Sequence, residues 1–321
     1  MIVRHVWIGG FYAFRLAETD RMMSRTAQGY AMAATSFLLT GLAGTLVTWA
    51  TAPASLLLVL RFAVAALLLS AVFARKRRLA GLFMPGVWPR LLVMGVLDAG
   101  SVLLYFVAIR ETGVAIATFF LFIQPVWVAL LAPRLLGSAT ERAVYVAIGL
   151  ALAGLVVILA PTLVGAGVHA SALGLVAGFG SGLCYAGFTL LAKGLMRQVD
   201  SGALVLTECT LDGLFLLPLA LWQTLGSGYS LTGRDLLVAL GLGVVCTAIA
   251  YALWMEGTRR VRVQHSAVLG FLTPVAAPVY ALVLLGQTVS AWTIAGGALI
   301  LVAGVLVVLG GQKDLEWEPP V

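Results

Sequence analysis

The stretch FFLFIQPVWVALLAPRLLG at residues 119–137 recurs later in the chain as VLGFLTPVAAPVYALVLLG at residues 268–286. The motifs Phe-x-x-Pro and Leu-Leu-Gly stand in the same register in both copies, at an offset of 149 positions. With this offset the match extends over residues 105–137 and 254–286 and also pairs two arginines. Apolar composition alone produces matches of Leu and Ala, but not all three features in one register. We therefore interpret the match as an internal repeat.

The surrounding chain is strongly apolar. Of its 321 residues, 61% are hydrophobic and 10% are charged, whereas soluble domains have about 45–50% and about 25%. The charged residues separate apolar runs that are each long enough to cross a bilayer core, which takes about 20 residues. We predict ten membrane-spanning helices, at about residues 28–48, 54–74, 89–110, 113–133, 143–161, 172–192, 203–223, 235–255, 264–285 and 291–310. The runs are continuous rather than alternating, which excludes a porin-like barrel, so the fold class is an all-α integral membrane protein.

The repeat divides these helices into two sets of five. The first and sixth runs also match, at an offset of 145 positions, with Gly29 facing Gly174 and Ser36 facing Ser181. Five is an odd number, so the second half enters the membrane from the opposite side and the two halves are inverted repeats. This architecture is typical of secondary transporters, because a site between the halves can be exposed to either side in turn.

Lys and Arg in the short loops predict the orientation in the membrane. One side holds seventeen of them, and the other holds Arg110 and Arg234. The seventeen are Arg4, Arg15, Arg21, Arg25, Arg75, Lys76, Arg77, Arg78, Arg90, Arg134, Arg142, Lys193, Arg197, Arg259, Arg260, Arg262 and Lys313. We therefore expect residues 1–27 and 312–321 to be cytoplasmic tails of a multi-pass protein of the inner (plasma) membrane.

The first 22 residues are a separate question. Arg15 and Glu18 interrupt what would have to be an apolar stretch, so we do not interpret them as a signal peptide. A membrane-surface helix, a disordered tail and a native start at Met22 or Met23 all stay open, and we assign this stretch no function.

Several motifs together resemble the EamA-type drug/metabolite transporter superfamily. They are the 5+5 arrangement, Arg61-Phe62, Phe-x-x-Pro in helices four and nine, Leu-Leu-Gly after each, and the glycines of the last helix, Gly296, Gly297 and Gly304. The resemblance makes residues 28–161 and 172–311 the two EamA-like repeats. It implies exporters of amino acids, related metabolites or drugs, with a central cavity lined by helices one, three, four, six, eight and nine. Helices five and ten would be more peripheral.

This chain departs from the family pattern at two places. The acidic residue usual after Leu-Leu-Gly is Ser138 in one half and Gln287 in the other. The first helix has Phe37-Leu38-Leu39 where the family frequently has Trp. Both departures bear on the subfamily and therefore on the substrate.

Pro125 and Pro274 lie in the middle of their predicted helices. Each removes a backbone donor, so the carbonyls of Leu121 and Gly270 need a substitute partner or must line a cavity. We predict a hinge at each of these symmetry-related positions, with simple kinking as the alternative.

Charged side chains inside membrane spans are costly and mark function by default. Four qualify, namely Arg61, Asp98, Glu208 and Asp212. Helix geometry puts Arg61 and Asp98 at levels about 7 Å apart, so we expect them to pair. Glu208 and Asp212 stand four residues apart on one helix face, and like charges this close favour a bound proton, which makes one of them a candidate proton carrier. The alternative is that Glu208 reaches water at the end of its helix.

Aromatic and hydroxyl side chains complete the predicted binding site, in the manner of a mostly apolar pocket with a few polar groups. The candidates are Thr40, Tyr105, Phe122, Gln124, Trp127, Ser181, Tyr185, Tyr251, Trp254, Phe271 and Thr273.

We expect no cofactor and no metal site. Cys184, Cys209 and Cys246 lie singly inside apolar runs and read as core residues, and no cluster of His, Asp and Glu has metal-ligand spacing. We interpret His265, near Arg262, as a residue at the membrane interface.

The resulting hypothesis is a secondary transporter that exports small amphiphilic metabolites, amino acids or related compounds, by alternating access. Its expected partners are a small-molecule substrate, the lipid bilayer and coupling protons, while a homodimer is left open and nucleic acid is excluded. An exporter of cationic drugs is the alternative if Asp98 faces the cavity unpaired. A passive facilitator or channel is another. An enzyme is disfavoured because HExxH and GxSxG are both missing.

Overall fold

The computed structural model describes the backbone of residues 3–73, 81–82, 84–165 and 171–313, and the side chains of residues 25–72, 81–82, 84–164 and 171–310. Eight of the seventeen basic residues that predict the orientation lie outside the described side chains, and they are Arg4, Arg15, Arg21, Arg75, Lys76, Arg77, Arg78 and Lys313. The same is true of most of the two tails.

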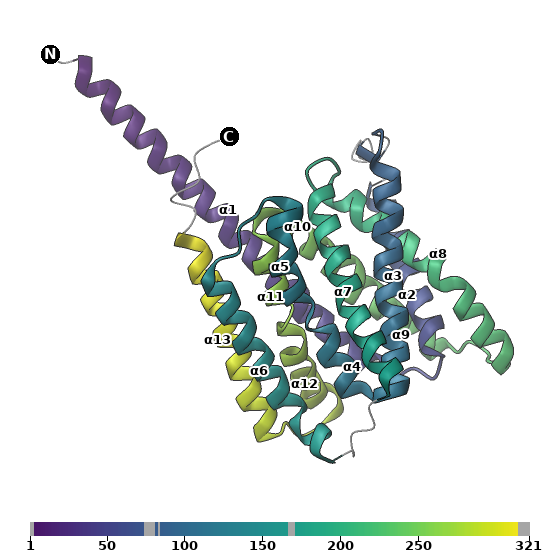
Figure 1. The fold of residues 1–321 in the computed structure, drawn as a ribbon. Helices are drawn as coiled ribbons and strands as arrows, with labels where there is room; N and C mark the ends of the chain where they lie inside the picture. The colour runs from purple at the N-terminus through teal and green to yellow at the C-terminus, as the bar shows by residue number, and fades with distance from the viewer. Residues whose placement is uncertain (1–2, 74–80, 83, 166–170, 314–321) are drawn as a thin grey trace.

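The described residues form helices and no strand (Figure 1). The elements are α1 (Val3–Val47), α2 (Ala54–Phe73), α3 (Val87–Thr112), α4 (Val114–Leu121), α5 (Gln124–Leu136), α6 (Arg142–Gly165), α7 (Ala172–Leu195), α8 (Ser201–Ser227), α9 (Gly233–Gly243), the π-helical segment η2 (Val244–Ile249), α10 (Ala250–Arg260), α11 (Val263–Leu269), α12 (Leu272–Leu285) and α13 (Ala291–Lys313). In this described part they build ten spans that are long and apolar enough to cross a membrane. The predicted all-α membrane fold is therefore confirmed, with span limits that differ by a few residues.

Spans four and nine are each divided into two helices. In span four, α4 ends at Leu121 and α5 begins at Gln124. In span nine, α11 ends at Leu269 and α12 begins at Leu272, which is the same place in the repeat to within one residue. Discontinuous helices in both halves of a transporter point to the substrate site.

The prolines lie at the start of the second helix of each divided span. Pro125 is in the first two positions of α5 and Pro274 is in the first turn of α12, where a missing N–H costs little. The carbonyl of Gly270 finds the substitute partner that it needs, because the backbone N–H of Thr273 donates to it at 3.1 Å. Both helices are interrupted at the two positions where a hinge was predicted, and the hinge motion itself stays a prediction.

The backbone conformation at its glycine explains the Leu-Leu-Gly motif. Gly137 ends α5 with φ 67° and Gly286 ends α12 with φ 66°. Both are in the left-handed region, which only glycine adopts at low cost. The motif therefore terminates the divided span in each repeat.

Helices of one half of the chain pack directly against helices of the other half. The first span of each half packs along the third span of the other, so α1 lies against α10 and α7 lies against α3. The fifth spans, α6 and α13, pack on each other at one edge of the molecule (Figure 1). Their contact is close, because a Cβ on Gly296 would lie 2.3 Å from the carbonyl oxygen of Gly154.

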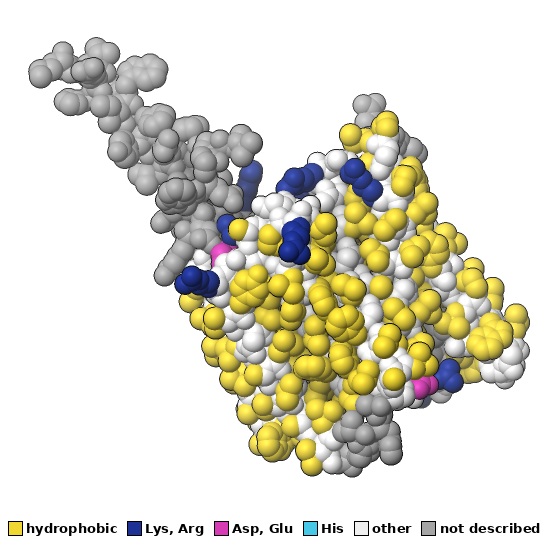
Figure 2. Space-filling view, viewed as in Figure 1, with side chains coloured by type: hydrophobic (Ala, Val, Ile, Leu, Met, Phe, Trp, Pro, Cys, Tyr) yellow, Lys and Arg dark blue, Asp and Glu magenta, His cyan; other side chains and the backbone are white. Residues whose placement is uncertain are grey.

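The surface separates apolar sides from charged ends. In Figure 2 the visible Lys and Arg side chains gather mostly at the upper end of the view, and the sides below this end are covered by hydrophobic residues. We call this end the basic end. Spans ending there carry Arg134, Arg142, Arg259, Arg260 and Arg262. The exposed Leu and Val side chains on the sides have a lipid partner in a multi-pass membrane protein.

Candidate functional site

A cavity of about 860 Å³ lies between the two halves. Its walls come from spans one to four and six to nine, so spans two and seven contribute beyond those that the family resemblance implies. Among the described residues α6 and α13 supply no part of the wall, as the resemblance implies for the fifth and tenth spans. Twelve of the predicted site residues line the cavity, and they are Thr40, Arg61, Asp98, Tyr105, Phe122, Gln124, Tyr185, Glu208, Tyr251, Trp254, Thr273 and Pro274. Their roles in binding, coupling and gating stay predictions.

The other five predicted site residues do not line the cavity. Phe271 is fully buried and packs on Phe122, with ring centroids 5.7 Å apart. Trp127 packs edge-on against Phe179 with ring centroids 5.0 Å apart, and neither residue lines the cavity. The side chain of Ser181 is buried, and its backbone oxygen accepts a hydrogen bond from Ser101. Asp212 and Pro125 are also buried outside the wall.

The wall includes residues that sequence reasoning missed. They are chiefly Ser36, Phe62, Ser101, Thr118, Phe188 and Thr189. Some are identifiable in retrospect by helical spacing, because Thr189 stands one turn after Tyr185 and Ser101 stands one turn after Asp98. Since small hydroxyl residues are common in membrane helices, this spacing signal is weak without the fold.

Stacked aromatic rings form one part of the wall. Tyr185 stacks on Phe188 with centroids 6.0 Å apart, and Phe188 stacks on Trp254 at 5.5 Å. Next to them Gln124 Nε2 donates to Thr189 Oγ1 at 3.0 Å, and Thr189 donates to the carbonyl of Tyr185. The aromatic surface is therefore bordered by a polar group whose geometry is held by α5 and α7 together.

Arg61 does not pair with Asp98 as expected. Its Nη2 donates to Tyr251 OH at 2.9 Å, and the guanidinium lies 4.8 Å from the ring centroid of Phe62. Both charged groups line the same cavity, yet within the described part of the chain no ion pair joins Arg61 to Asp98. Helix geometry sets only the level of Arg61 along α2, whereas the rotation of the helices decides which group its side chain meets, and here that group is Tyr251 of α10.

Three carboxyl groups converge beside the cavity. Asp98 of α3 and Glu208 and Asp212 of α8 each place an oxygen within 4.8 Å of the others, and all three side chains are buried. Glu208 is 1% exposed, so the alternative that it reaches water is wrong. Among the described residues no N–H or hydroxyl group donates a hydrogen bond to Glu208 Oε2 or to either oxygen of Asp212. Because three buried carboxylates repel one another and lose their hydration, this cluster needs protons or a cation.

The cavity opens away from the basic end. On α1 its lining residues run from the middle of the span to Thr48, and on spans four and nine they reach Val114 and Gln287. We call this side the open end. Toward the basic end the lining stops at Thr189, Trp254 and Ala267, which lie four to six residues from the basic-end termini of α7, α10 and α11.

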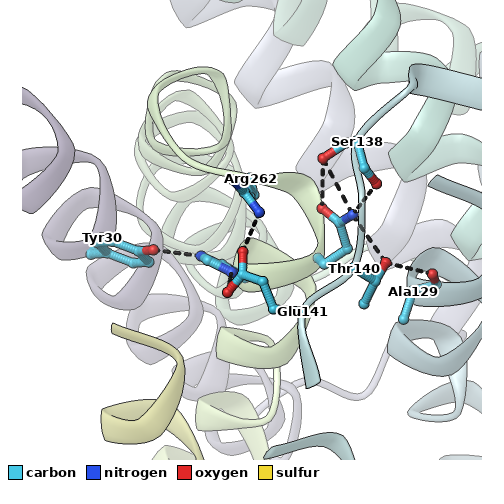
Figure 3. Close-up of polar contacts among 8 residues, drawn as sticks. Tyr30, Ala129, Ser138, Thr140, Glu141 and Arg262 are labelled. Atoms are coloured by element: carbon cyan, nitrogen blue, oxygen red, sulfur yellow. Dashed lines mark hydrogen bonds and ion pairs between the residues drawn. The ribbon is translucent and has the colours of Figure 1, made fainter. Parts of the chain in front are cut away.

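Polar contacts close the basic end. Arg262 donates to Glu141 in a salt bridge, and His265 Nε2 lies 3.4 Å from the second oxygen of Glu141. Tyr30 OH lies 2.5 Å from His265 Nδ1. Figure 3 shows Tyr30, Glu141 and Arg262 around this group of polar contacts. We call Tyr30, Glu141, Arg262 and His265 the clasp, because they join three helices at the basic end, namely α1, α11 and the start of α6.

The basic end shows where two residues noted in the sequence, His265 and Ser138, lie. His265 is 1% exposed, so it is not an interfacial residue. Beside it Gln264 donates to the backbone oxygen of Ser138 at 2.8 Å and to Thr140 at 3.2 Å. Ser138, where the family usually has an acid, therefore takes part in closing this end.

Comparisons with known proteins agree with this architecture. The model of the EamA-like transporter family matches residues 27–160 and 172–309. An "Uncharacterized transporter" of Archaeoglobus fulgidus is 32% identical over 68% of this chain and 75% of its own length. "Uncharacterized transporter YwfM" of Bacillus subtilis is 27% identical over 70% of this chain and 75% of its own. A solved crystal structure superposes with a TM-score of 0.75 at 20% identity, over 89% of this chain and 98% of that chain, which shows the fold alone. The two matched repeats, the ten spans and the relatives together show that this chain belongs to the EamA-like transporter family.

Proposed function

We propose that this transporter exports small amphiphilic metabolites, amino acids or related compounds, across the inner (plasma) membrane by alternating access. The observation that carries the proposal is a cavity between two repeats that is open at one end and closed at the other. Helices divided at the same position of each repeat meet there, which is the arrangement that alternating access uses. Export and the cytoplasmic position of the basic end rest on the family resemblance and on the bias of Lys and Arg.

The walls suit an amphiphilic solute. Stacked Tyr185, Phe188 and Trp254 offer an apolar surface. Arg61 offers a cation for an anionic group, and Asp98 offers a carboxyl for an ammonium group. A mostly apolar pocket with few convergent polar groups is the usual site for a small molecule.

The carboxyl cluster supports proton coupling. Its three acids face one guanidinium in the same region, so the ionised cluster carries excess negative charge in a place of low dielectric. A proton taken up and released once in each cycle would neutralise part of that charge. Glu208, which lines the cavity, is the member placed to exchange a proton with a solute.

The test is counterflow of labelled amino acids in proteoliposomes, with and without a pH gradient. We expect exchange without a gradient and net accumulation with one. In Glu208→Gln, exchange should persist while gradient-driven accumulation is lost. Glu256→Gln, which changes a carboxyl group that does not line the cavity, should behave as the parent. Flux without counterflow would favour a channel, and no flux of any solute would refute the proposal.

An exporter of organic cations is the second candidate, because Asp98 lines the cavity without an ion pair in the described part of the chain. Labelled tetraethylammonium separates it from the first, since this ion has no carboxylate for Arg61. If it is the substrate, Arg61→Met should be mild while Asp98→Asn is well expressed and inactive. If zwitterions are the substrates, both variants should lose transport.

A further inference from the structure

An apolar plug lies under the cavity at the closed, basic end. Six small or branched residues from three helices form one buried cluster, in which α5 supplies Val128 and Ala132, α7 supplies Ala186 and Leu190, and α11 supplies Val263 and Ala267. The helix α5 packs against α11 here, so the plug joins the two halves of the chain. The plug and the clasp together separate the cavity from the basic end.

The repeat maps each plug residue to a second position. With the offset of 149, the residues of α5 correspond to Ala277 and Ala281 of α12, and those of α11 correspond to Val114 and Thr118 of α4. With the offset of 145, the residues of α7 correspond to Gly41 and Thr45 of α1. All six corresponding residues line the cavity on its way to the open end.

We infer that Gly41, Thr45, Val114, Thr118, Ala277 and Ala281 form a second gate, which closes the open end when the plug opens. This inference rests on the proposed alternating access, in which the two halves exchange conformations. In that exchange α4 meets α12 as α5 meets α11 now, and the six residues become a buried cluster.

The side chains fit this role. Glycine, alanine and threonine are the residues that let membrane helices approach closely. The hydroxyl of Thr118 already has a partner in Tyr105 OH at 3.0 Å, so it enters an apolar contact without losing its hydrogen bond. Gly41 already lies against α12, where an added Cβ would stand 2.7 Å from Ala276.

The second gate lacks a clasp. The repeat partners of Glu141, Arg262 and His265 are Ser290, Gly113 and Ile116, and none of these can form an ion pair. Among the described residues the repeat equivalents of the clasp therefore supply no ion pair at the open end, whereas the basic end has packing and ion pairing. This asymmetry favours the conformation seen here.

Paired cysteines test the inference. The background replaces Cys184, Cys209 and Cys246 by Ala and must first be shown to transport. In it, the pair Ala132→Cys with Val263→Cys reports the plug. The pair Val114→Cys with Ala281→Cys reports the second gate.

Under mild oxidation in membranes we expect the plug pair to cross-link at once and the second-gate pair to cross-link more slowly, as the protein visits the other conformation. A further Glu141→Gln change should speed the second-gate cross-link. The control pair Val114→Cys with Val283→Cys, whose second site is 73% exposed on α12, should stay reduced.

The outcomes separate the gate from the proposed function. If the protein transports but the second-gate pair cross-links no faster than the control pair, the gate is wrong and alternating access needs other contacts. If the second-gate pair cross-links while proteoliposomes show no flux, the conformational exchange stands and the proposed function fails.

Discussion

Removing the charge of Glu141 should open the basic end. Glu141 accepts a hydrogen bond from Arg262 and lies beside buried His265. These contacts join the start of α6, in the first half, to α11, in the second half, and this boundary between the halves must separate when the plug opens. The substitution Glu141→Gln keeps the size of the side chain and removes its charge. A hydrogen bond to a charged group contributes about 1.5–3 kcal/mol. The lower part of that range applies here, because the two side chains are 19% and 28% exposed.

The expected effect is a population shift. A loss of about 1.5 kcal/mol changes an equilibrium constant slightly more than tenfold, so the ratio of molecules open at the basic end to those closed there should rise by roughly that factor. The assay is labelling of Ala132→Cys by a water-soluble maleimide that is supplied at the basic end of the cysteine-free protein.

Glu256→Gln is the matched control. Glu256 also pairs with arginines, Arg259 and Arg260, but all three belong to α10, so this contact does not cross the boundary. We expect its labelling rate to equal that of the parent. Equal rates in the Glu141 and Glu256 variants would refute the clasp as a determinant of the conformation.

Three further predictions follow from the fold. Pro125→Ala and Pro274→Ala each restore a backbone donor where the span is divided, so each should lower the rate of transport while the amount of protein in the membrane stays nearly unchanged. If both variants transport at the parental rate, the breaks in spans four and nine serve only helix packing. Gly182→Ala should lower the free energy of unfolding of the purified protein by about 1–3 kcal/mol, because the added Cβ would lie 2.4 Å from the carbonyl oxygen of Phe120 in α4. Gly149→Ala, which meets nothing within 4 Å, should be neutral or stabilising, and equal losses would contradict this reasoning. A reporter inserted at residues 165–169 should be accessible from outside the cell, and an internal signal there would overturn the assigned orientation.

The sequence by itself was enough for the number of spans, their limits to within a few residues, and the repeat. These properties depend on local composition, because about 20 apolar residues form a spanning helix whatever their neighbours are. The places where spans four and nine divide were also predictable, since Pro125, Pro274 and the Leu-Leu-Gly ends act through the backbone of their own helices.

The tertiary structure decided which side chains meet. Helical spacing gave the levels of Arg61 and Asp98, but the rotation of each helix, set by packing, turned Arg61 toward Tyr251. For the same reason sequence spacing did not reveal that Asp98 joins Glu208 and Asp212. His265 looked interfacial at a helix start and is buried in the clasp, because α1, α6 and α11 come together around it. Contacts between helices distant in sequence depend on rotation and tilt, which hydropathy does not encode.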